Sequence, residues 1–141
     1  MSEQPTPERR RHNVSRYMSV DLQTITPQTT VMAAARLLLQ HHISGAPVMN
    51  EAGELIGVVS ERDVMKVLSG DTANAALLVQ AVMSTQVVTV PQDMSMITLA
   101  SLFKHNPYRR LPVVHEGKLV GQISRSDVLR FLLELTSESA A

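Results

Sequence analysis

The sequence contains no cysteine, carries no net charge and has no long apolar run. Without cysteine the chain can form no disulfide scaffold, no thiolate metal site and no cysteine nucleophile. No apolar stretch approaches the ~20 residues of a membrane-spanning helix. The polar start SEQPTPERRRHN lacks the apolar segment of a secretory signal. With 13 basic and 13 acidic residues, no overall charge draws the chain to nucleic acid. We therefore expect a soluble, cytoplasmic protein.

What the sequence does contain is an internal duplication. The segment LIGVVSERDVMKVL from Leu55 recurs as LVGQISRSDVLRFL from Leu119. Three residues recur 64 positions later: Gly57, Ser60 and Asp63 return as Gly121, Ser124 and Asp127. Upstream the offset is 65, as for Met18-Ser19 and Met83-Ser84. The offset changes in the turn between Asn50 and Gly57, where a change of one residue costs least.

Each copy predicts the order β-α-β-β-α, and thus an α/β (α+β) fold. The expected elements are extended segments at 22–26 and 87–90, helices at 29–42 and 95–106, hairpins around Gly53 and Gly117, and closing helices at 61–68 and 125–135. We expect a disordered leader at 1–13, a first repeat at 14–68, a linker at 69–78, a second repeat at 79–135 and a tail at 136–141. The strands are too apolar for sheets wetted on one face. We therefore expect the repeats to pack about a pseudo-twofold axis, with two clefts at the seam.

The Ser-x-x-Asp segments that open the closing helices leave two interpretations open. Ser60 with Asp63, and Ser124 with Asp127, resemble a capping box, although Asp is short for reaching back to the cap. The same helix N-terminus offers free N–H groups and a positive dipole end to a phosphate. A carboxylate there can also accept ribose hydroxyls. The segment serves either as a cap alone or as a cap and a ligand contact.

An arginine pair distinguishes the second copy. Arg109 and Arg110 precede LPVV, where the first copy has Ser44 and Gly45. The pair is either an exposed basic turn or a forked contact to phosphate, and in the second case the two clefts differ. The arginines at 9–11 are consistent with a nucleic-acid- or phosphate-binding arm, but we favour the interpretation as a solvated, frayed terminus. The histidines lack metal-site spacing, and no nucleophile, P-loop or dinucleotide motif occurs, so we expect neither a metal site nor an enzyme.

The paired copies resemble a known module. The order of elements, the segments ISGAPV and YRRLPV, and two G-x-x-S-x-x-D motifs are similar to a CBS-domain pair (tandem CBS repeat), named after cystathionine β-synthase, over about residues 14–135. The resemblance implies two CBS repeats, with each cleft taking base contacts from one repeat and sugar-phosphate contacts from the other.

The implied ligand-binding residues of the better nucleotide cleft are Ser19, Leu22, Gln23, Ile43, Ser44, Arg109, Arg110, Ser124, Ser126 and Asp127. Those of the second cleft are Ser84, Val87, Val88, Tyr108, Ser60, Arg62 and Asp63. The second cleft lacks the arginine pair, and Arg62 substitutes for it only in part.

The resemblance further implies a stand-alone regulatory module that senses an adenosine-containing ligand: AMP, ADP, ATP or S-adenosylmethionine. Ligand binding would transmit a conformational change to a regulated protein on another chain, and the module would form a homodimer. The alternative is a ligand-free structural or dimerisation module with degenerate clefts. A nucleic-acid binder that uses the arginine leader ranks third, and an enzyme ranks fourth.

Overall fold

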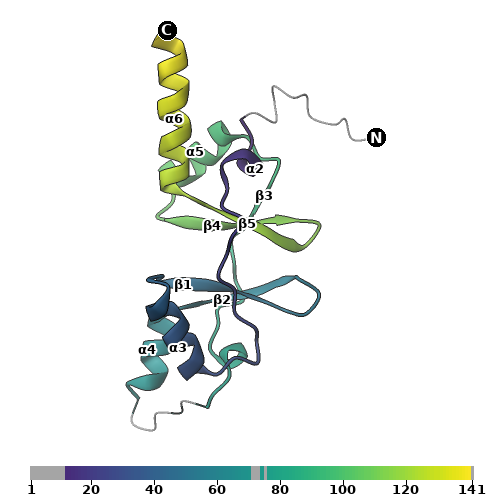
Figure 1. The fold of residues 1–141 in the computed structure, drawn as a ribbon, viewed down its shortest axis with the longest axis vertical. Coiled ribbons are helices and arrows are strands. Elements are labelled where there is room, and N and C mark those ends of the chain that lie inside the picture. Colours follow the sequence, from purple (N-terminus) through teal and green to yellow (C-terminus); the bar gives the residue numbers. More distant parts are fainter. Residues whose placement is uncertain (1–11, 71–73, 75, 141) are drawn as a thin grey trace. The chain divides into compact units, whose positions relative to one another are not determined.

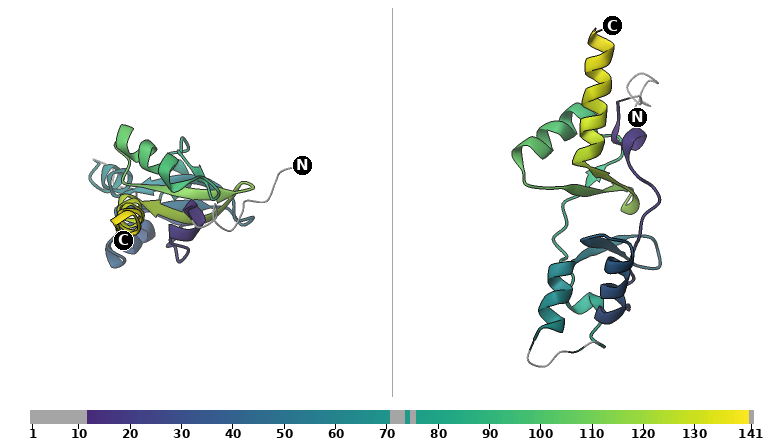
Figure 2. Two further views of the ribbon diagram at one scale, coloured as in Figure 1. Left: turned by 90° about the horizontal axis from the view of Figure 1, so that it is seen from above. Right: turned by 60° about the vertical axis from the view of Figure 1, so that its left-hand side comes forward.

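The computed structural model describes residues 12–70, 74 and 76–140. The leader predicted at 1–13 therefore lies almost wholly outside the described residues, together with its arginines at 9–11, part of the linker and residue 141. The chain divides into two compact units (Figures 1 and 2). Unit 1 comprises Met1–Leu22, Val88–Glu116 and Val120–Ala141, and unit 2 comprises Gln23–Val87 and Gly117–Leu119.

Unit 2 is built around an antiparallel hairpin of β1 (Gly45–Met49) and β2 (Leu55–Ser60). The helices α3 (Val31–Gln40) and α4 (Glu61–Leu68) lie side by side on one side of this hairpin (Figure 2), and a short 3₁₀ turn, η1, spans Val79–Ala81. Val48 pairs with Gly57 but Met49 pairs with Leu55, so the strands contain a bulge where the repeat offset changes. The buried core is Ile25, Val31, Ala34, Leu38, Ala46, Val48, Val59, Val64 and Val79.

Unit 1 contains most of a three-stranded sheet in the order β3-β4-β5, formed by Val90–Pro91, Arg110–His115 and Lys118–Ser124. The first two residues of β5 are assigned to unit 2. The helices α5 (Met96–His105) and α6 (Arg125–Ala140) lie on one side of the β4–β5 hairpin (Figure 1). The short helix α2 (Val14–Tyr17) contacts α6. The buried core is Val14, Val90, Met96, Leu99, Phe103, Leu111, Val113, Ile123, Val128 and Phe131.

The helices α3 and α5 begin directly after the capping residues that the sequence predicted. The hydroxyl of Thr30 accepts a hydrogen bond from the N–H of Ala33, and Ser95 accepts one from Thr98, each at 3.1 Å. The structure differs from the sequence expectation at the edges of the repeats. Asn13 is buried and bridges Ser95 although it was assigned to the leader. Helix α6 continues through residues 136–140, which were assigned to the tail.

Each compact unit contains a short segment that, along the sequence, belongs to the other repeat. Ser19, from the first repeat, pairs with Gln122 of β5 through two 2.9 Å hydrogen bonds. Ser84, from the second repeat, pairs in the same way with Val58 of β2. Each unit is therefore one repeat completed by the Met-Ser segment of the other, which boundaries drawn along the sequence did not predict.

This exchange explains why both copies keep a glycine. A Cβ on Gly121 would stand 2.6 Å from Sδ of Met18 and 2.9 Å from the carbonyl oxygen of Ser19. On Gly57 it would stand 2.7 Å from Sδ of Met83 and 2.9 Å from the carbonyl oxygen of Ser84. Only glycine lets the exchanged segment approach so closely.

Candidate functional site

Both Ser-x-x-Asp segments form a strand-to-helix junction closed by reciprocal hydrogen bonds. Ser60 ends β2 and caps α4, where its N–H and its hydroxyl donate to Oδ2 of Asp63 at 2.8 and 2.9 Å. The N–H of Asp63 donates back to the Ser60 hydroxyl at 3.2 Å. Ser124 and Asp127 repeat the arrangement at 2.8, 2.9 and 3.3 Å. Asp is shorter than the usual Glu or Gln, yet it reaches back to the cap at both positions, so the sequence-based argument against a capping box is wrong.

The two aspartates differ at their second oxygen. In unit 1 the guanidinium of Arg130 donates to Oδ1 of Asp127, whose side chain is 10% exposed. In unit 2 the position equivalent to Arg130 is Lys66, and among the described residues no partner is recorded for Oδ1 of Asp63. Sequence reasoning missed Arg130, although its spacing of three residues from Asp127 on a helix was a readable signal.

The turn before each hairpin contacts the same junction. The carbonyl oxygen of Ser44 accepts from the N–H of Glu61 at 2.8 Å, and that of Arg109 accepts from the N–H of Arg125 at 3.0 Å. Nε of Arg125 also donates to the carbonyl oxygen of Tyr108 at 2.7 Å. Each unit thus brings its hairpin entry against its own Ser-x-x-Asp helix.

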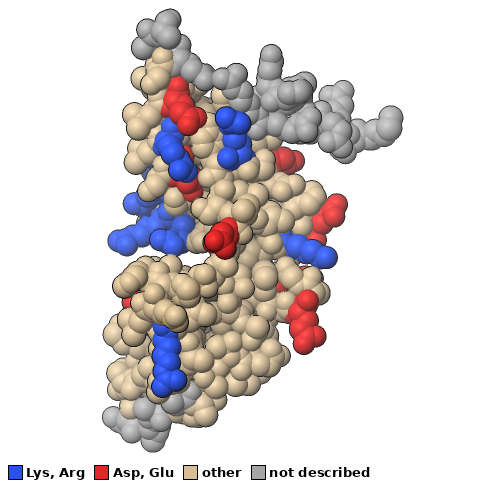
Figure 3. All heavy atoms as spheres, viewed as in Figure 1, with Lys and Arg blue, Asp and Glu red and all other residues tan. Residues whose placement is uncertain are grey.

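The two Ser-x-x-Asp junctions differ in net charge. The arginine pair lies at the start of β4, as the sequence predicted. In unit 1 four arginines stand against one aspartate, a net charge of +3: Arg109, Arg110, Arg125 and Arg130 with Asp127. In unit 2 two cations stand against two carboxylates, a net charge of zero: Arg62 and Lys66 with Glu61 and Asp63. Figure 3 shows basic side chains gathered where β4 and α6 of unit 1 begin. An anion is attracted to clustered positive charge. This difference supports the sequence-based prediction that the unit 1 junction is the better phosphate site, which stays a prediction.

The other predicted site residues are distributed over the two units. Unit 1 holds Ser19, Leu22, Val88, Tyr108 and Ser126, and unit 2 holds Gln23, Ile43, Ser84 and Val87. Ser19 lies beside Gln122, two residues before Ser124, and Ser84 lies beside Val58, two residues before Ser60. Each predicted cleft draws on both units, so the joining of its two halves stays a prediction.

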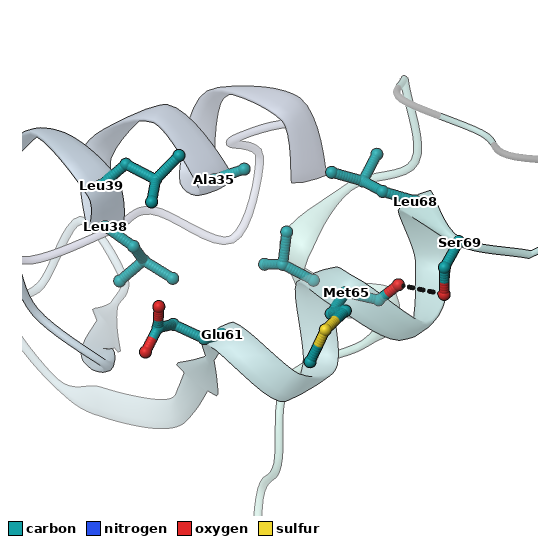
Figure 4. Close-up of a pocket in the computed structure, with 8 residues that line it drawn as sticks. Ala35, Leu38, Leu39, Glu61, Met65, Leu68 and Ser69 are labelled. Atoms are coloured by element: carbon teal, nitrogen blue, oxygen red, sulfur yellow. Dashed lines mark hydrogen bonds between the residues drawn. The ribbon is translucent and has the colours of Figure 1, made fainter.

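A cavity in unit 2 runs along two helices and shares only Glu61 with the junction residues named above. It has a volume of about 380 Å³ and lies between α3 and α4, as Figure 4 shows. Its lining is mostly apolar and consists of Ala35, Leu38, Leu39, Glu61, Val64, Met65, Leu68 and Ser69. None of the predicted ligand-binding residues lines it. In the part of the chain that the structure describes, no group of three or more His, Asp or Glu side chains could hold a metal ion. No helix there is long and apolar enough to span a bilayer.

Comparison with known proteins gives the family. The model of the CBS domain matches residues 14–70 and 79–134. CBS domain-containing protein YhcV of Bacillus subtilis is 31% identical over 123 residues, which make up 87% of this chain and 86% of that protein. Inosine-5'-monophosphate dehydrogenase of Korarchaeum cryptofilum is 33% identical over 109 residues, but this chain spans only 22% of that enzyme.

The fold has close structural counterparts. The CBS-pair protein CBSX2 of Arabidopsis thaliana matches with a TM-score of 0.75 at 29% identity, over 89% of this chain and 97% of that one. CBSX2 has also been solved in complex with AMP. The mixed α/β architecture and the two copies predicted from the sequence are those of CBS-pair proteins. The chain belongs to the CBS domain family.

Proposed function

We propose that this chain is a regulatory module that binds an adenosine-containing ligand at its Ser-x-x-Asp helices and has no catalytic role. The candidates are AMP, ADP, ATP and S-adenosylmethionine. Support comes from CBSX2, a relative of almost the same length that has been crystallised with AMP. The single observation that carries the proposal in this chain is the basic junction of unit 1. There Arg130 contacts the buried carboxylate of Asp127 at a helix N-terminus, and the same strand-to-helix junction also holds Arg109, Arg110 and Arg125.

Each part of that edge suits one part of a nucleotide. The exposed side chains of Arg109 and Arg110 can form forked, charge-assisted contacts to phosphate. The N-terminal turn of α6 adds a positive dipole end, and the exposed hydroxyl of Ser126 adds a donor. The carboxylate of Asp127 accepts from ribose. The base contacts from Leu22, Gln23, Ile43 and Ser44 belong to the proposal as sequence-based predictions.

The mechanism we propose is linkage between ligand binding and conformation. A ligand shifts an equilibrium between two arrangements only by the difference in its affinity for them. A ligand that contacts both repeats would favour one arrangement, and a regulated protein on another chain would bind that arrangement preferentially.

A thermal-shift panel tests ligand binding. The purified chain is heated with AMP, ADP, ATP or S-adenosylmethionine, and at 100 times Kd a binder stabilises the folded state by about 2.7 kcal/mol. We expect Asp127→Ala to reduce the ligand-induced rise in Tm. The rise is measured against the variant's own Tm without ligand, because the substitution also removes a helix cap and lowers that Tm. Ser95→Ala, which removes the cap of a different helix, α5, is the control and should keep the full shift. No shift with any of the four at millimolar concentration would refute the proposal.

One observation favours the alternative, a structural module with empty clefts. Ser60 with Asp63, and Ser124 with Asp127, satisfy each other's hydrogen bonds without any ligand. Under this alternative the two aspartates act only as helix caps. Their substitution would then lower Tm equally with and without nucleotide.

The homodimer expected from the sequence also belongs to this proposal. Equivalent positions on α4 and α6 expose a large apolar side chain, with Met65 at 60% and Leu129 at 61%. The duplication thus presents the same apolar feature twice, which suits contact with a second copy of the chain. Light scattering after size exclusion should give twice 15.5 kDa, and Met65→Glu with Leu129→Glu should give the monomer. A wild-type monomer at tens of micromolar would contradict this part.

A further inference from the structure

The two Ser-x-x-Asp helices share their cap geometry but differ three residues beyond the aspartate. Unit 1 has Arg130 there, and unit 2 has Lys66. Arg130 donates to Oδ1 of Asp127. No contact between Lys66 and Asp63 is recorded among the described residues, and the ammonium of Lys66 belongs to an exposed side chain. A planar guanidinium matches a carboxylate in a way that an ammonium on a flexible stem does not.

The difference changes how many acceptor sites each aspartate carboxylate can offer to a ligand. A carboxylate has about four lone-pair sites, two on each oxygen. In both units Oδ2 is filled by the N–H and the hydroxyl of the capping serine. The free sites are therefore on Oδ1. Asp63 keeps two of them, whereas Asp127 keeps one because Arg130 takes the other.

We propose that Arg130 is a specificity-determining residue that makes the two aspartates unequal receptors for ribose. Asp63 accepts both hydroxyls of a vicinal diol, whereas Asp127 accepts one and leaves recognition at that junction to the phosphate-binding arginines. The inference rests on the proposed function. Within it, the unit 2 junction, with no net charge, prefers an adenosine compound with a free ribose and little negative charge. The unit 1 junction prefers a phosphorylated one.

The energetics favour a measurable difference. A hydrogen bond from a hydroxyl to a charged acceptor corresponds to about ten- to a hundred-fold in affinity. The pair of Arg130 with Asp127 is partly solvated, since the arginine side chain is 59% exposed. Such a pair alters binding by about two- to five-fold when a ligand must displace it. The loss of one ribose contact therefore outweighs the direct effect of the ion pair.

The test isolates each junction and probes it with uncharged ligands. Asp127→Asn leaves the unit 2 carboxylate, and Asp63→Asn leaves the unit 1 carboxylate, each with a side chain of the same size. Calorimetry then gives the ratio of affinities for adenosine over 2',3'-dideoxyadenosine. We expect the ratio to be about ten-fold higher in Asp127→Asn than in Asp63→Asn. Adding Arg130→Ala to Asp63→Asn should raise its ratio toward that of the unit 2 junction.

Matched variants complete the design. Lys66→Ala added to Asp127→Asn removes a cation from the equivalent position and should leave the ratio unchanged, whereas Lys66→Arg should lower it. If the Asn variants do not fold, Arg130→Lys and Lys66→Arg in the otherwise native chain should raise and lower the overall ratio. Equal ratios at both junctions, unaffected by Arg130→Ala, would overturn this inference while the proposed function stands. No binding of adenosine or of any of its nucleotides would overturn both.

Discussion

Replacing Gly121 with alanine tests the exchange of Met-Ser segments between the repeats. The new Cβ would lie 2.6 Å from Sδ of Met18, 2.9 Å from its Cγ and 2.9 Å from the carbonyl oxygen of Ser19. The methionine side chain can rotate away. The carbonyl oxygen cannot move freely, because Ser19 and Gln122 hold each other through two 2.9 Å hydrogen bonds. The backbone clash is therefore the part that must be relieved by movement of the chain.

Two alternative costs and one compensating gain set the expected magnitude. Overpacking by one methyl group costs about 1–3 kcal/mol when neighbouring groups must shift. If the segment detaches instead, two hydrogen bonds of about 1 kcal/mol each are lost. The lower entropy of the unfolded alanine chain offsets about 0.4–1 kcal/mol. After this offset we expect Gly121→Ala to lower the free energy of unfolding by about 1–2 kcal/mol.

Urea unfolding followed by circular dichroism measures this change. The control is Gly70→Ala, whose Cβ would meet its nearest atoms at ordinary contact distances of 3.5 and 3.6 Å. This variant should leave the midpoint unchanged or raise it slightly. Adding Met18→Ala to Gly121→Ala removes the side-chain clash and leaves the carbonyl clash, so the double variant should recover little stability. If Gly121→Ala proved as stable as Gly70→Ala, the argument for the exchanged segment would be wrong.

Three further substitutions probe local features. His42 has φ 53° at the C-terminal end of α3, so His42→Gly should raise the free energy of unfolding by about 1 kcal/mol; a lower urea midpoint would contradict this. Burial raises the pKa of the Tyr17 hydroxyl, and its 2.7 Å hydrogen bond to Glu134 raises it further. The neutral hydroxyl therefore stabilises the fold below about pH 10, and this contribution is lost as pH rises through the folded-state pKa; Tyr17→Phe should flatten that decline in urea titrations, and an unchanged decline would argue against it. Ser95→Ala removes the cap of α5 and should cost about 1 kcal/mol in the same assay, whereas no loss would show that the cap does not contribute.

The local elements were predictable because their signals are local. Ser95 and Thr30 cap helices by bonding to an N–H three residues ahead, and Ser60 does the same for α4. Gly53 and Gly117 have φ near +80° in the hairpin turns, where a sequence of apolar runs around glycine predicts them. The boundaries of α4, 61–68, are those expected from the sequence.

The candidate site was predictable in part. Both Ser-x-x-Asp junctions and the arginine pair at the start of β4 lie where the sequence placed them. The reach of Asp63 and Asp127 back to their caps was misjudged, because it depends on the torsion angles of the first helical turn and not on residue type. The pairing of Arg130 with Asp127 went unnoticed although its spacing is local.

The sequence by itself determined that this protein is a duplicated CBS-family chain, that each copy has the same order of elements, and that the copies differ at Ser44 and Arg109. Only the tertiary structure decided which repeat each Met-Ser segment completes, because the pairing of Ser19 with Gln122 joins residues about a hundred positions apart. Such a pairing depends on long-range hydrogen bonds and on the space that Gly121 leaves, and no local propensity specifies it. The tertiary structure also decided how many acceptor sites each aspartate keeps free, since that number depends on which neighbours donate to its two oxygens.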